Sequence, residues 1–395
     1  MKIAILTSGI MPVPAVQGGA VENLIDFYLA YNEQHRLHDI TVYSVWHPDT
    51  TKRNELKSTV NHYAYIKVTG LLAKLKKKFY QLTHKNEYYH YTIEYFLNEA
   101  LQQIRHQQYD LLIIENRPGY ALKVPQYTKA PIVLHLHNDF LNDTVPHAKA
   151  IYQAADRIVS VSDYITNRVK TLDSNSRKCV TVYNGIDLSL FSPTTAKHID
   201  RSQLSLRPDD FVIIYSGRIN REKGIFELIQ AIKRLDNPRV KLLVIGSSFY
   251  GNATHDDPFI QELKQEASPL KERITFTGFI PYPDMPRYLA LADIAVIPSQ
   301  WEEPFGLTCL EAMAMKLPVI TTRKGGIPEI ACNDNAILLD TGKDFIPHLA
   351  AAIQSLYQQP ERRKNMSEAS LRQAQRFSNI EYARKFFEAI VIIKE

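Results

Sequence analysis

Short apolar runs alternate with amphipathic stretches along nearly the whole chain. The apolar runs predict buried strands and the amphipathic stretches predict helices, and this alternation is typical of parallel α/β sheets. One set of predicted strands lies near residues 2–7, 39–44, 110–114, 132–136 and 156–161, and a second set lies near 211–216, 240–246, 273–276, 293–298 and 318–321. The pattern therefore predicts two sheets.

Two sheets in 395 residues predict two domains, because one ordinary core does not grow to that size. Between the two sets of strands, the polar stretch Phe191–Thr195 contains a Ser-Pro pair and is the best linker. We expect an N-terminal domain over residues 1–195 and a C-terminal domain over 196–378. The last stretch, residues 379–395, is helical by its pattern.

Composition agrees with a globular protein of the reducing cytoplasm. Hydrophobic residues make up 45% and charged residues 23% of the chain, and the net charge of +5 is too small to indicate a nucleic-acid partner. Cys179, Cys309 and Cys332 have neither metal-site spacing nor the number that a disulfide framework requires. The N-terminus predicts a strand and not a signal peptide, and no apolar stretch reaches membrane-spanning length.

The most informative block is Glu-Pro-Phe-Gly-Leu-Thr-Cys-Leu-Glu, residues 303–311. It follows a predicted buried strand and opens a predicted helix, 307–315, so Glu303 lies in the loop and Glu311 on the first turns of the helix. The backbone N–H groups around Phe305, Gly306 and Leu307 are the unpaired donors of a helix N-terminus. Carboxylates for hydroxyl groups and amides for phosphates suit a sugar nucleotide.

A second block, Gly217-Arg-Ile-Asn-Arg-Glu-Lys-Gly224, also stands between a predicted strand and a predicted helix, 225–235. Arg218 and Lys223 can both reach a diphosphate at such a turn. The alternative is an ordinary basic surface loop.

Two segments of the N-terminal half add candidates. Gly18 and Gly19 follow the first strand and lead into a helix from Ala20, where glycines permit close approach of the backbone to a ligand, although a glycine pair alone is also a plain loop. His135 and His137 stand at the end of a strand, where open α/β sheets place ligands. A histidine is more commonly structural. Alternation keeps His135 within the strand, so His137 is the candidate.

Taken in order, these segments resemble the paired-Glu motif and phosphate loops of retaining GT-B glycosyltransferases, specifically glycosyltransferase family 4 (glycosyl transferases group 1), including its spore-coat-associated and cell-surface polysaccharide members. Three further segments resemble elements of that family: Val182–Asp187, Thr277–Ile280 and Gly325–Glu329. The resemblance implies the GT-B fold: two Rossmann-like domains facing across a cleft, with the C-terminal helix crossing back to the first domain.

The resemblance also implies roles for individual residues. Arg218 and Lys223 hold the donor's phosphates, Glu303 binds sugar hydroxyls, and Glu311 binds the ribose. His137 lies beside the transferred sugar and joins Arg218, Lys223 and Glu303 as a catalytic residue. The implied donor site comprises Gly18, Gly19, Gly217, Arg218, Lys223, Phe279, Ile280, Glu303, Phe305, Gly306, Leu307, Thr308 and Glu311.

The implied activity is hexosyl transfer with retention from a nucleoside-diphosphate sugar, UDP being the commonest nucleotide, to a glycan, lipid-linked or cell-surface acceptor. No metal or other cofactor is implied, since cationic side chains occupy that electrostatic role. Asp256 and Asp257 lie in a polar loop, and we interpret them as solvated.

Three alternatives remain open. A nucleotide-sugar epimerase would use the same fold without an acceptor. A sugar phosphorylase would be larger and would show the context of a pyridoxal-phosphate lysine. A non-catalytic coat or scaffold protein would retain the fold, although unused buried charges are costly to keep.

Residues 70–80 mix Lys74, Lys76, Lys77 and Lys78 with leucines and Phe79. At helical spacing Leu71, Leu72, Leu75 and Phe79 gather on one face. Such a segment suits the headgroup region of an anionic membrane, and would allow peripheral attachment at the inner face of the cell membrane. The alternative is an ordinary surface helix whose apolar stripe packs on its own domain.

Overall fold

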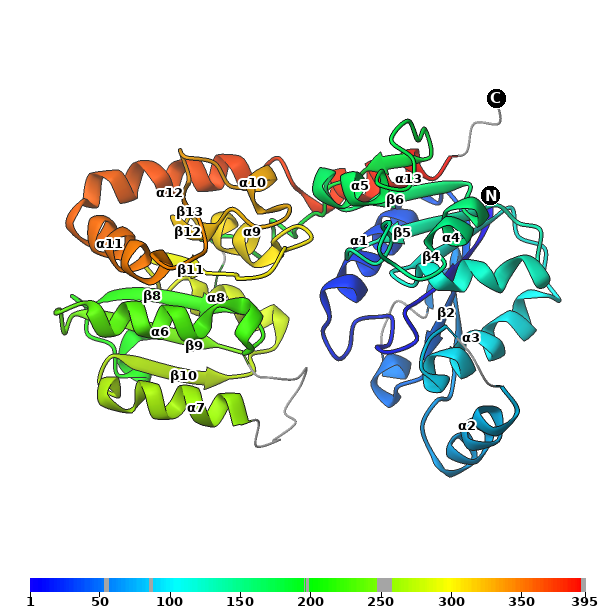
Figure 1. Ribbon diagram of the computed structural model, residues 1–395, viewed down its shortest axis with the longest axis horizontal. Helices are drawn as coiled ribbons and strands as arrows, with labels where there is room; N and C mark the ends of the chain where they lie inside the picture. Colours follow the sequence, from blue (N-terminus) through cyan, green and yellow to red (C-terminus); the bar gives the residue numbers. More distant parts are fainter. Residues whose placement is uncertain (53–56, 85–87, 195, 197–198, 247–257, 392–395) are drawn as a thin grey trace. The chain divides into compact units, whose positions relative to one another are not determined.

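The computed structural model describes the chain except for residues 53–56, 85–87, 195, 197–198, 247–257 and 392–395. Asp256 and Asp257 lie outside the described residues. The chain divides into two compact units, the first formed by Met1–Gly185 with Asn379–Glu395 and the second by Ile186–Ser378 (Figure 1). The first unit thus ends at Gly185 rather than at residue 195, and it includes the end of the chain.

The first unit is built on a seven-stranded parallel sheet with the order β3-β2-β1-β4-β5-β6-β7. Its central strands are apolar and buried on both faces, as parallel sheets covered by helices require. The strands are β1 (Lys2–Leu6), β2 (Asp39–Val45), β3 (Asn61–Ile66), β4 (Leu111–Glu115), β5 (Ile132–Leu136), β6 (Arg157–Ser160) and β7 (Cys179–Thr181). The strand order reverses between β1 and β4, which makes their carboxyl ends the switch point where such sheets bind ligands.

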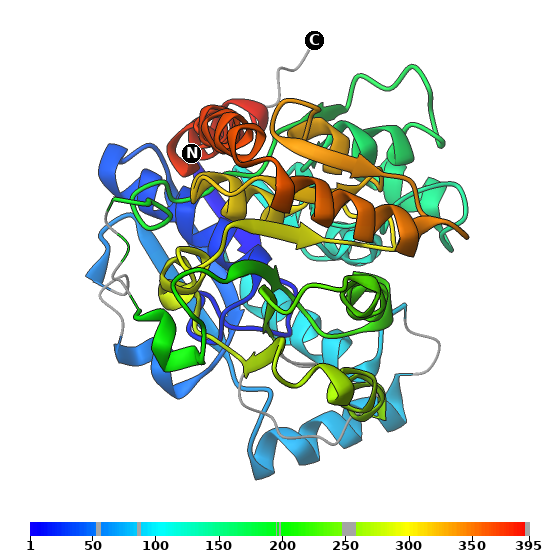
Figure 2. The same cartoon turned by 90° about the vertical axis from the view of Figure 1, so that its left-hand side faces the viewer.

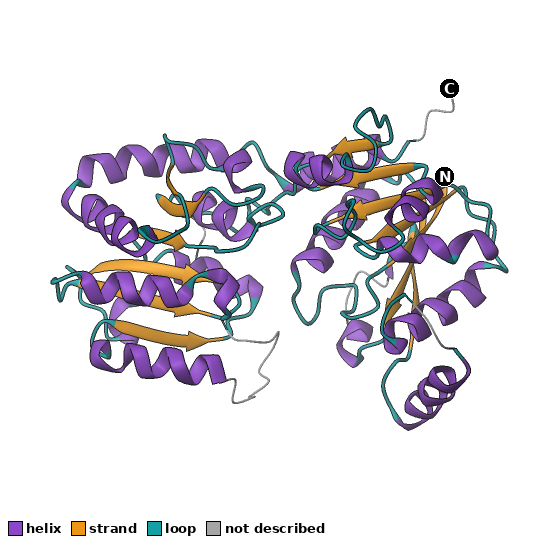
Figure 3. Ribbon diagram, in the orientation of Figure 1, coloured by secondary structure: helices purple, strands orange, loops and turns teal. Residues whose placement is uncertain are grey.

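The helices of the first unit flank its sheet (Figure 3). They are α1 (Ala20–His35), α2 (Leu71–Thr83), α3 (Tyr91–Ile104), α4 (Ala148–Ala154), α5 (Asp163–Val169) and α13 (Asn379–Ala389). The last of these packs against α1, where the rings of Tyr28 and Phe386 stack with centroids 4.4 Å apart. This contact buries both rings and ties the end of the chain to the first unit.

The second unit repeats the plan with a six-stranded parallel sheet of order β10-β9-β8-β11-β12-β13. Its strands are β8 (Phe211–Ser216), β9 (Val240–Ile245), β10 (Ile274–Gly278), β11 (Ile294–Ile297), β12 (Val319–Thr322) and β13 (Ala336–Leu339), and its helices are α6 (Ile225–Arg234), α7 (Pro258–Ala267), α8 (Met285–Leu289), α9 (Leu307–Ala314), α10 (Ile327–Ile330), α11 (Phe345–Gln358) and α12 (Pro360–Ala374). The order reverses between β8 and β11. The prediction of two parallel α/β sheets is confirmed.

Helix α2 packs on α3 at the edge of the first unit, where the rings of Tyr80 and Tyr95 meet edge to face with centroids 6.2 Å apart. Figures 1 and 2 both show α2 at the margin of the first unit. No helix in the described part of the chain is both long and apolar enough to cross a membrane.

Candidate active site

In the second unit the two polar blocks predicted from sequence meet at the switch point. Gly217 follows β8, and the loop that carries Glu303 follows the neighbouring strand β11. Lys223 ends a short 3₁₀ turn, where its backbone N–H donates to the side chain of Asn220 at 3.1 Å. The sheet order therefore brings together residues that lie far apart in the sequence.

Lys223 and Glu303 form an ion pair with Nζ 2.6 Å from Oε1. The hydroxyl of Ser299 donates to the same carboxylate oxygen at 2.7 Å, and Nζ also lies 5.0 Å from the ring centroid of Trp301. Glu303 is only 7% exposed. The lysine and the serine hydroxyl hold this buried carboxylate in place. Either of them can be exchanged for a donor group of a bound ligand.

Two glycines allow close backbone packing around the Lys223–Glu303 pair. A Cβ on Gly224 would lie 1.9 Å from the carbonyl oxygen of Pro298, and a Cβ on Gly325 would lie 2.0 Å from that of Glu303. The same Glu303 carbonyl accepts a hydrogen bond from the N–H of Gly326 at 2.7 Å. The position of Glu303 therefore depends on backbone packing that excludes any larger residue at position 325.

Helix α9 begins at Leu307, directly after Gly306, which has φ 104° and offers no side-chain cap. The N–H groups of Leu307 and Thr308, on the first helical turn, have no acceptor among the described residues and remain donors for a ligand, whereas the Cys309 N–H donates to the Gly306 carbonyl at 3.0 Å. On the next turn Glu311 is half-buried, and its carboxylate makes no hydrogen bond or ion pair with the described residues. Burial raises the pKa of Glu311 to about 8. An unpartnered carboxyl beside free amide groups is suited to accept hydroxyl donors.

The remaining predicted donor residues differ in exposure. Arg218 is exposed, and its guanidinium makes no ion pair or hydrogen bond with the residues that the structure describes. Phe279 and Ile280 are half-buried just after β10. Phe305 is buried against Phe377, with ring centroids 6.0 Å apart, so only its backbone is available to a ligand. Thr308 is half-buried on the first turn of α9.

In the first unit the switch point holds a fully buried carboxylate, Glu115, at the end of β4. His135 Nδ1 lies 3.0 Å from Glu115 Oε2, and His137 Nε2 lies 2.9 Å from the same oxygen. The hydroxyl of Tyr28 donates to Oε1 at 2.9 Å. As predicted, His135 lies within β5 and His137 just after its end. Three groups, from α1, β5 and the residue just after β5, thus converge on one carboxylate.

Burial and neighbouring charges give Glu115 and His137 different protonation states. Burial acts to raise the pKa of Glu115, but the charge of His135 and the hydrogen bonds from both histidines outweigh it and lower that pKa to about 2. Burial, with the nearby His135, lowers the pKa of His137 to about 4. At neutral pH, Glu115 is therefore ionised and His137 is neutral.

Glu22 adds a second buried carboxyl at this edge. It lies in the first turn of α1, after the predicted glycine pair, and a Cβ on Gly19 (φ 107°) would lie 2.2 Å from its Oε2. Gly18 has φ 77° and open space around it. The Ser8 hydroxyl is 3.5 Å from Glu22 Oε1, and burial raises the pKa of Glu22 to about 7.

Glu115 and Glu22 were not among the predicted site residues. The signal for Glu115 was available, because an acidic residue directly ends the wholly apolar run Leu111–Ile114 at the carboxyl end of a strand.

The ligand atoms of Glu115, His135 and His137 lie within 4.8 Å of one another, as in a metal site. Nevertheless, the carboxylate already faces three hydrogen-bonding groups, and the outward ring nitrogens, His135 Nε2 and His137 Nδ1, have no partner among the described residues. Metal-bound histidines ordinarily donate that second N–H to an acceptor. The cluster is therefore better described as a hydrogen-bonded carboxylate than as a metal centre.

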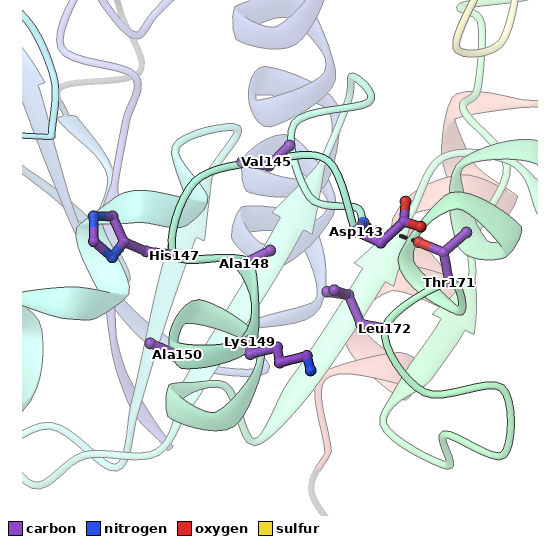
Figure 4. Close-up of a pocket in the computed structure, with 8 residues that line it drawn as sticks. All are labelled: Asp143, Val145, His147, Ala148, Lys149, Ala150, Thr171 and Leu172. Atoms are coloured by element: carbon purple, nitrogen blue, oxygen red, sulfur yellow. Dashed lines mark hydrogen bonds between the residues drawn. The ribbon is translucent and has the colours of Figure 1, made fainter.

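Figure 4 shows a surface pocket of the first unit that other residues line. The Asp143 N–H donates to the Thr171 hydroxyl at 3.0 Å on one side of it, while the ring of His147 lies on the other. Its lining consists of Asp143, Val145, His147, Ala148, Lys149, Ala150, Thr171 and Leu172. None of the predicted site residues lines this pocket.

Two Rossmann-like sheets, each with charged side chains at its switch point, define a two-domain nucleotide-binding α/β protein. Comparison with known proteins makes this class specific. Residues 27–190 match the family model described as Glycosyltransferase Family 4, and residues 196–373 match the model described as Glycosyl transferases group 1.

Similar proteins agree with this assignment. Spore coat protein SA of Bacillus subtilis is 27% identical over 395 residues, covering 95% of this chain and 95% of that protein. A lipopolysaccharide 1,2-N-acetylglucosaminetransferase of Salmonella typhimurium is 33% identical over 131 residues, covering 33% of this chain and 34% of that enzyme. The crystal structure of Anabaena HepE in complex with UDP-glucose is similar with a TM-score of 0.73 and 20% identity, covering 98% of both chains.

The chain belongs to the family 4, group 1 glycosyltransferases. It is a transferase of the GT-B fold that uses nucleotide sugars, and the predictions of family, fold and enzyme class are confirmed.

Proposed function

We propose that the enzyme transfers a sugar from a UDP-sugar to a glycan, lipid-linked or cell-surface acceptor with retention of the anomeric configuration. The observation that carries the proposal is the Lys223–Glu303 pair at the β8–β11 switch point, beside the open N-terminus of α9. The nucleotide preference is supported by the similar fold of Anabaena HepE, which was crystallised with UDP-glucose.

Each side chain then has a task. Lys223 and the exposed Arg218 neutralise the diphosphate, together with the free N–H groups at the start of α9. Glu311 accepts hydrogen bonds from the ribose hydroxyls, and Glu303 accepts them from the sugar. The acceptor oxygen forms its bond to the anomeric carbon on the face from which the diphosphate leaves, and the acceptor proton passes to a diphosphate oxygen. No metal enters this scheme.

Thermal unfolding with a panel of nucleotides tests the donor assignment, because a ligand that binds only the folded state raises the melting temperature. We expect UDP to raise it more than GDP or ADP at equal concentration. The anomeric configuration of the product, read by NMR, then tests retention. Failure of every nucleoside diphosphate to shift the transition would contradict the proposal.

A coat or scaffold role is the second candidate, because the chain resembles spore coat protein SA along its length. The Lys223–Glu303 ion pair, and a Glu311 carboxylate without a partner among the described residues, favour a working donor site, since such groups cost stability when they serve no ligand. Nucleotide binding separates the two roles. Incubation with a UDP-sugar and no acceptor separates a transferase from an epimerase, which alone would yield an isomeric nucleotide sugar.

The acceptor side of the proposal includes a membrane contact through α2. Its large apolar residues face outward: Leu71, Leu72, Leu75, Phe79 and Leu82 are 60–77% exposed. Instead, Ala73 and Tyr80 are the buried residues of this helix. The apolar stripe thus lies on the face opposite to the one that packs on the unit.

Lysines border this exposed stripe. At 100° per residue, Lys76 and Lys78 fall on either side of it and Lys74 lies next to Lys78. Exposed apolar side chains flanked by cations match the acyl–headgroup boundary of an anionic leaflet in both hydrophobicity and charge. We take the occupant of this face to be an anionic lipid surface, which would present a lipid-linked acceptor to the first unit.

Vesicle co-sedimentation tests the contact. We expect binding to vesicles containing phosphatidylglycerol at low salt, and loss of binding at high salt or after replacing Lys74, Lys76, Lys77 and Lys78 with Gln. The matched control replaces four exposed lysines elsewhere, Lys129, Lys271, Lys343 and Lys364. Equal binding of both variants to the vesicles, or binding that does not depend on the anionic lipid, would contradict the proposed membrane contact.

A further inference from the structure

The protonation of His137 follows from its partner. Glu115 is fully buried and ionised, and an ionised carboxylate offers only lone pairs. The His137 ring nitrogen that faces it at 2.9 Å, Nε2, must therefore carry the hydrogen. The ring is neutral at neutral pH, so its other nitrogen, Nδ1, is a bare acceptor.

That acceptor is left without a hydrogen bond. His137 Nδ1 is buried and has no partner among the residues described. A buried polar atom whose hydrogen bond is unmade costs roughly 1–3 kcal/mol, so such atoms are uncommon unless they serve another purpose.

The last residue of β4 and the residue that follows the strand both hold His137. Glu115 holds the ring, and the side chain of the next residue, Asn116, accepts a hydrogen bond from the His137 backbone N–H at 3.2 Å. Both contacts lie at the carboxyl edge of the sheet beside the β1–β4 switch point, where open α/β sheets bind ligands.

We propose that Glu115 is a positioning residue that holds His137 in its Nε2–H tautomer, so that Nδ1 accepts a hydrogen bond from a hydroxyl of the sugar being transferred. Glu115 itself touches no substrate and acts only through His137. This inference rests on the proposed function for its substrate, but the tautomer is a property of the protein alone.

The decisive variant is Glu115→Gln. The amide keeps the shape of the side chain but offers one acceptor oxygen where three donors now converge, so a histidine must turn or change tautomer. We expect the His137 imidazole nitrogen signals in NMR to lose the Nε2–H pattern, and kcat to fall by about 10²-fold or more, as in other enzymes whose histidine loses its orienting carboxylate. UDP affinity should stay unchanged, because Arg218, Lys223 and Glu311, to which the proposed function assigns the diphosphate and the ribose, lie in the second unit.

Glu94→Gln is the matched control. Glu94 is also a buried carboxylate of the first unit, paired with Lys123 at 2.9 Å, and it makes no contact with the histidines. The Glu94→Gln variant should keep both the His137 NMR signals and the kcat of the wild type. If Glu115→Gln does not fold, the wild-type spectrum decides alone, since a proton on Nδ1 of His137 at neutral pH overturns the proposal.

The outcomes separate the two proposals. An Nε2–H tautomer in an enzyme that transfers no sugar supports the positioning of His137 and removes the proposed function. Sugar transfer with wild-type kcat in Glu115→Gln overturns the role of Glu115 and leaves the proposed function standing. The third outcome is a divalent metal that copurifies in stoichiometric amount and whose removal by chelation shifts the NMR signals of both histidines. That outcome overturns the positioning role of Glu115 in favour of a metal site.

Discussion

The ammonium group of Lys223 lies 2.6 Å from a carboxylate oxygen of Glu303, although 80 positions separate the two residues in the sequence. Each group neutralises the other while the site holds no ligand. In the proposed donor site, a diphosphate would compete with Glu303 for the lysine, and a sugar would compete with the lysine for Glu303. The proposal thus makes donor binding an exchange of partners within a preformed site.

The two cations should differ in what their loss does to the fold. Lys223→Ala leaves the buried Glu303 without its cation and should lower the free energy of unfolding by about 1–3 kcal/mol. Arg218→Ala removes an exposed side chain that has no partner among the described residues, and it should leave the free energy of unfolding unchanged. Both variants should lower turnover by about 10²-fold or more. Denaturant titration and initial rates measure the two effects, and wild-type turnover in either variant would rule out its phosphate role.

Glu311 and Glu303 should contribute differently to UDP affinity. Glu311→Ala should weaken UDP binding because the ribose hydroxyls lose their acceptor. Glu303→Ala frees Lys223 for the diphosphate, so it should keep UDP affinity while damaging turnover with the full donor. Calorimetry with UDP alone measures the difference, and an equal loss of affinity in both variants would contradict these roles.

UDP binding should depend on pH through Glu311. Burial holds its pKa at about 8, so below this value the free enzyme carries a proton that must leave before the carboxylate can accept the ribose hydroxyls. The association constant should rise between about pH 7 and 8 and level off above, in a range where the phosphates of UDP are already ionised. Glu311→Gln should bind more weakly and without this rise, and an unchanged slope in that variant would exclude Glu311 as its source.

Gly325 should be required for the position of Glu303. An added Cβ would lie 2.0 Å from the Glu303 carbonyl oxygen, so Gly325→Ala must move that loop and should lower donor turnover by about 10²-fold, as small misplacements of catalytic groups do. Gly342→Ala is the control, since Gly342 also has a positive φ but open space around it. Equal activity in the two variants would show that the close approach is unimportant.

The sequence predicts the centre of each sheet better than its edges. All ten predicted strands are present within two residues of their expected ends, as with β8 at Phe211–Ser216. The missed strands β3, β7 and β13 all lie at sheet edges. Edge strands are covered less completely than central ones, and β3 is accordingly rich in polar and aromatic residues, while β7 and β13 are short. The apolar signal of β3 is therefore weak and β7 spans only three residues, whereas β13 is wholly apolar and its composition does not explain why it was missed.

The donor blocks were predictable because their chemistry is local. Glu303, Glu311 and Lys223 each stand in a strand–loop–helix segment that can be recognised in the sequence by itself. The end of an apolar run places Glu115 at a sheet edge, but its convergence with His135, His137 and the nearby Glu22 depends on sheet order and burial, which no short segment shows. The exposure of the α2 stripe was equally undecided by sequence, because helical spacing gives the apolar face but not the direction in which that face turns.

The return of α13 to the first unit makes the second unit an uninterrupted insertion, Ile186–Ser378, whose two ends meet where the Ile186 N–H donates to the Phe377 carbonyl at 2.8 Å. On the ribosome, every residue of the second unit is synthesised before Phe386 exists to stack on Tyr28. The second unit can therefore complete its core first. The first unit still lacks α13 at that stage, so one face of α1 remains uncovered. The order of synthesis thus assigns the late-folding step, and the exposure to aggregation that goes with it, to the unit that begins the chain.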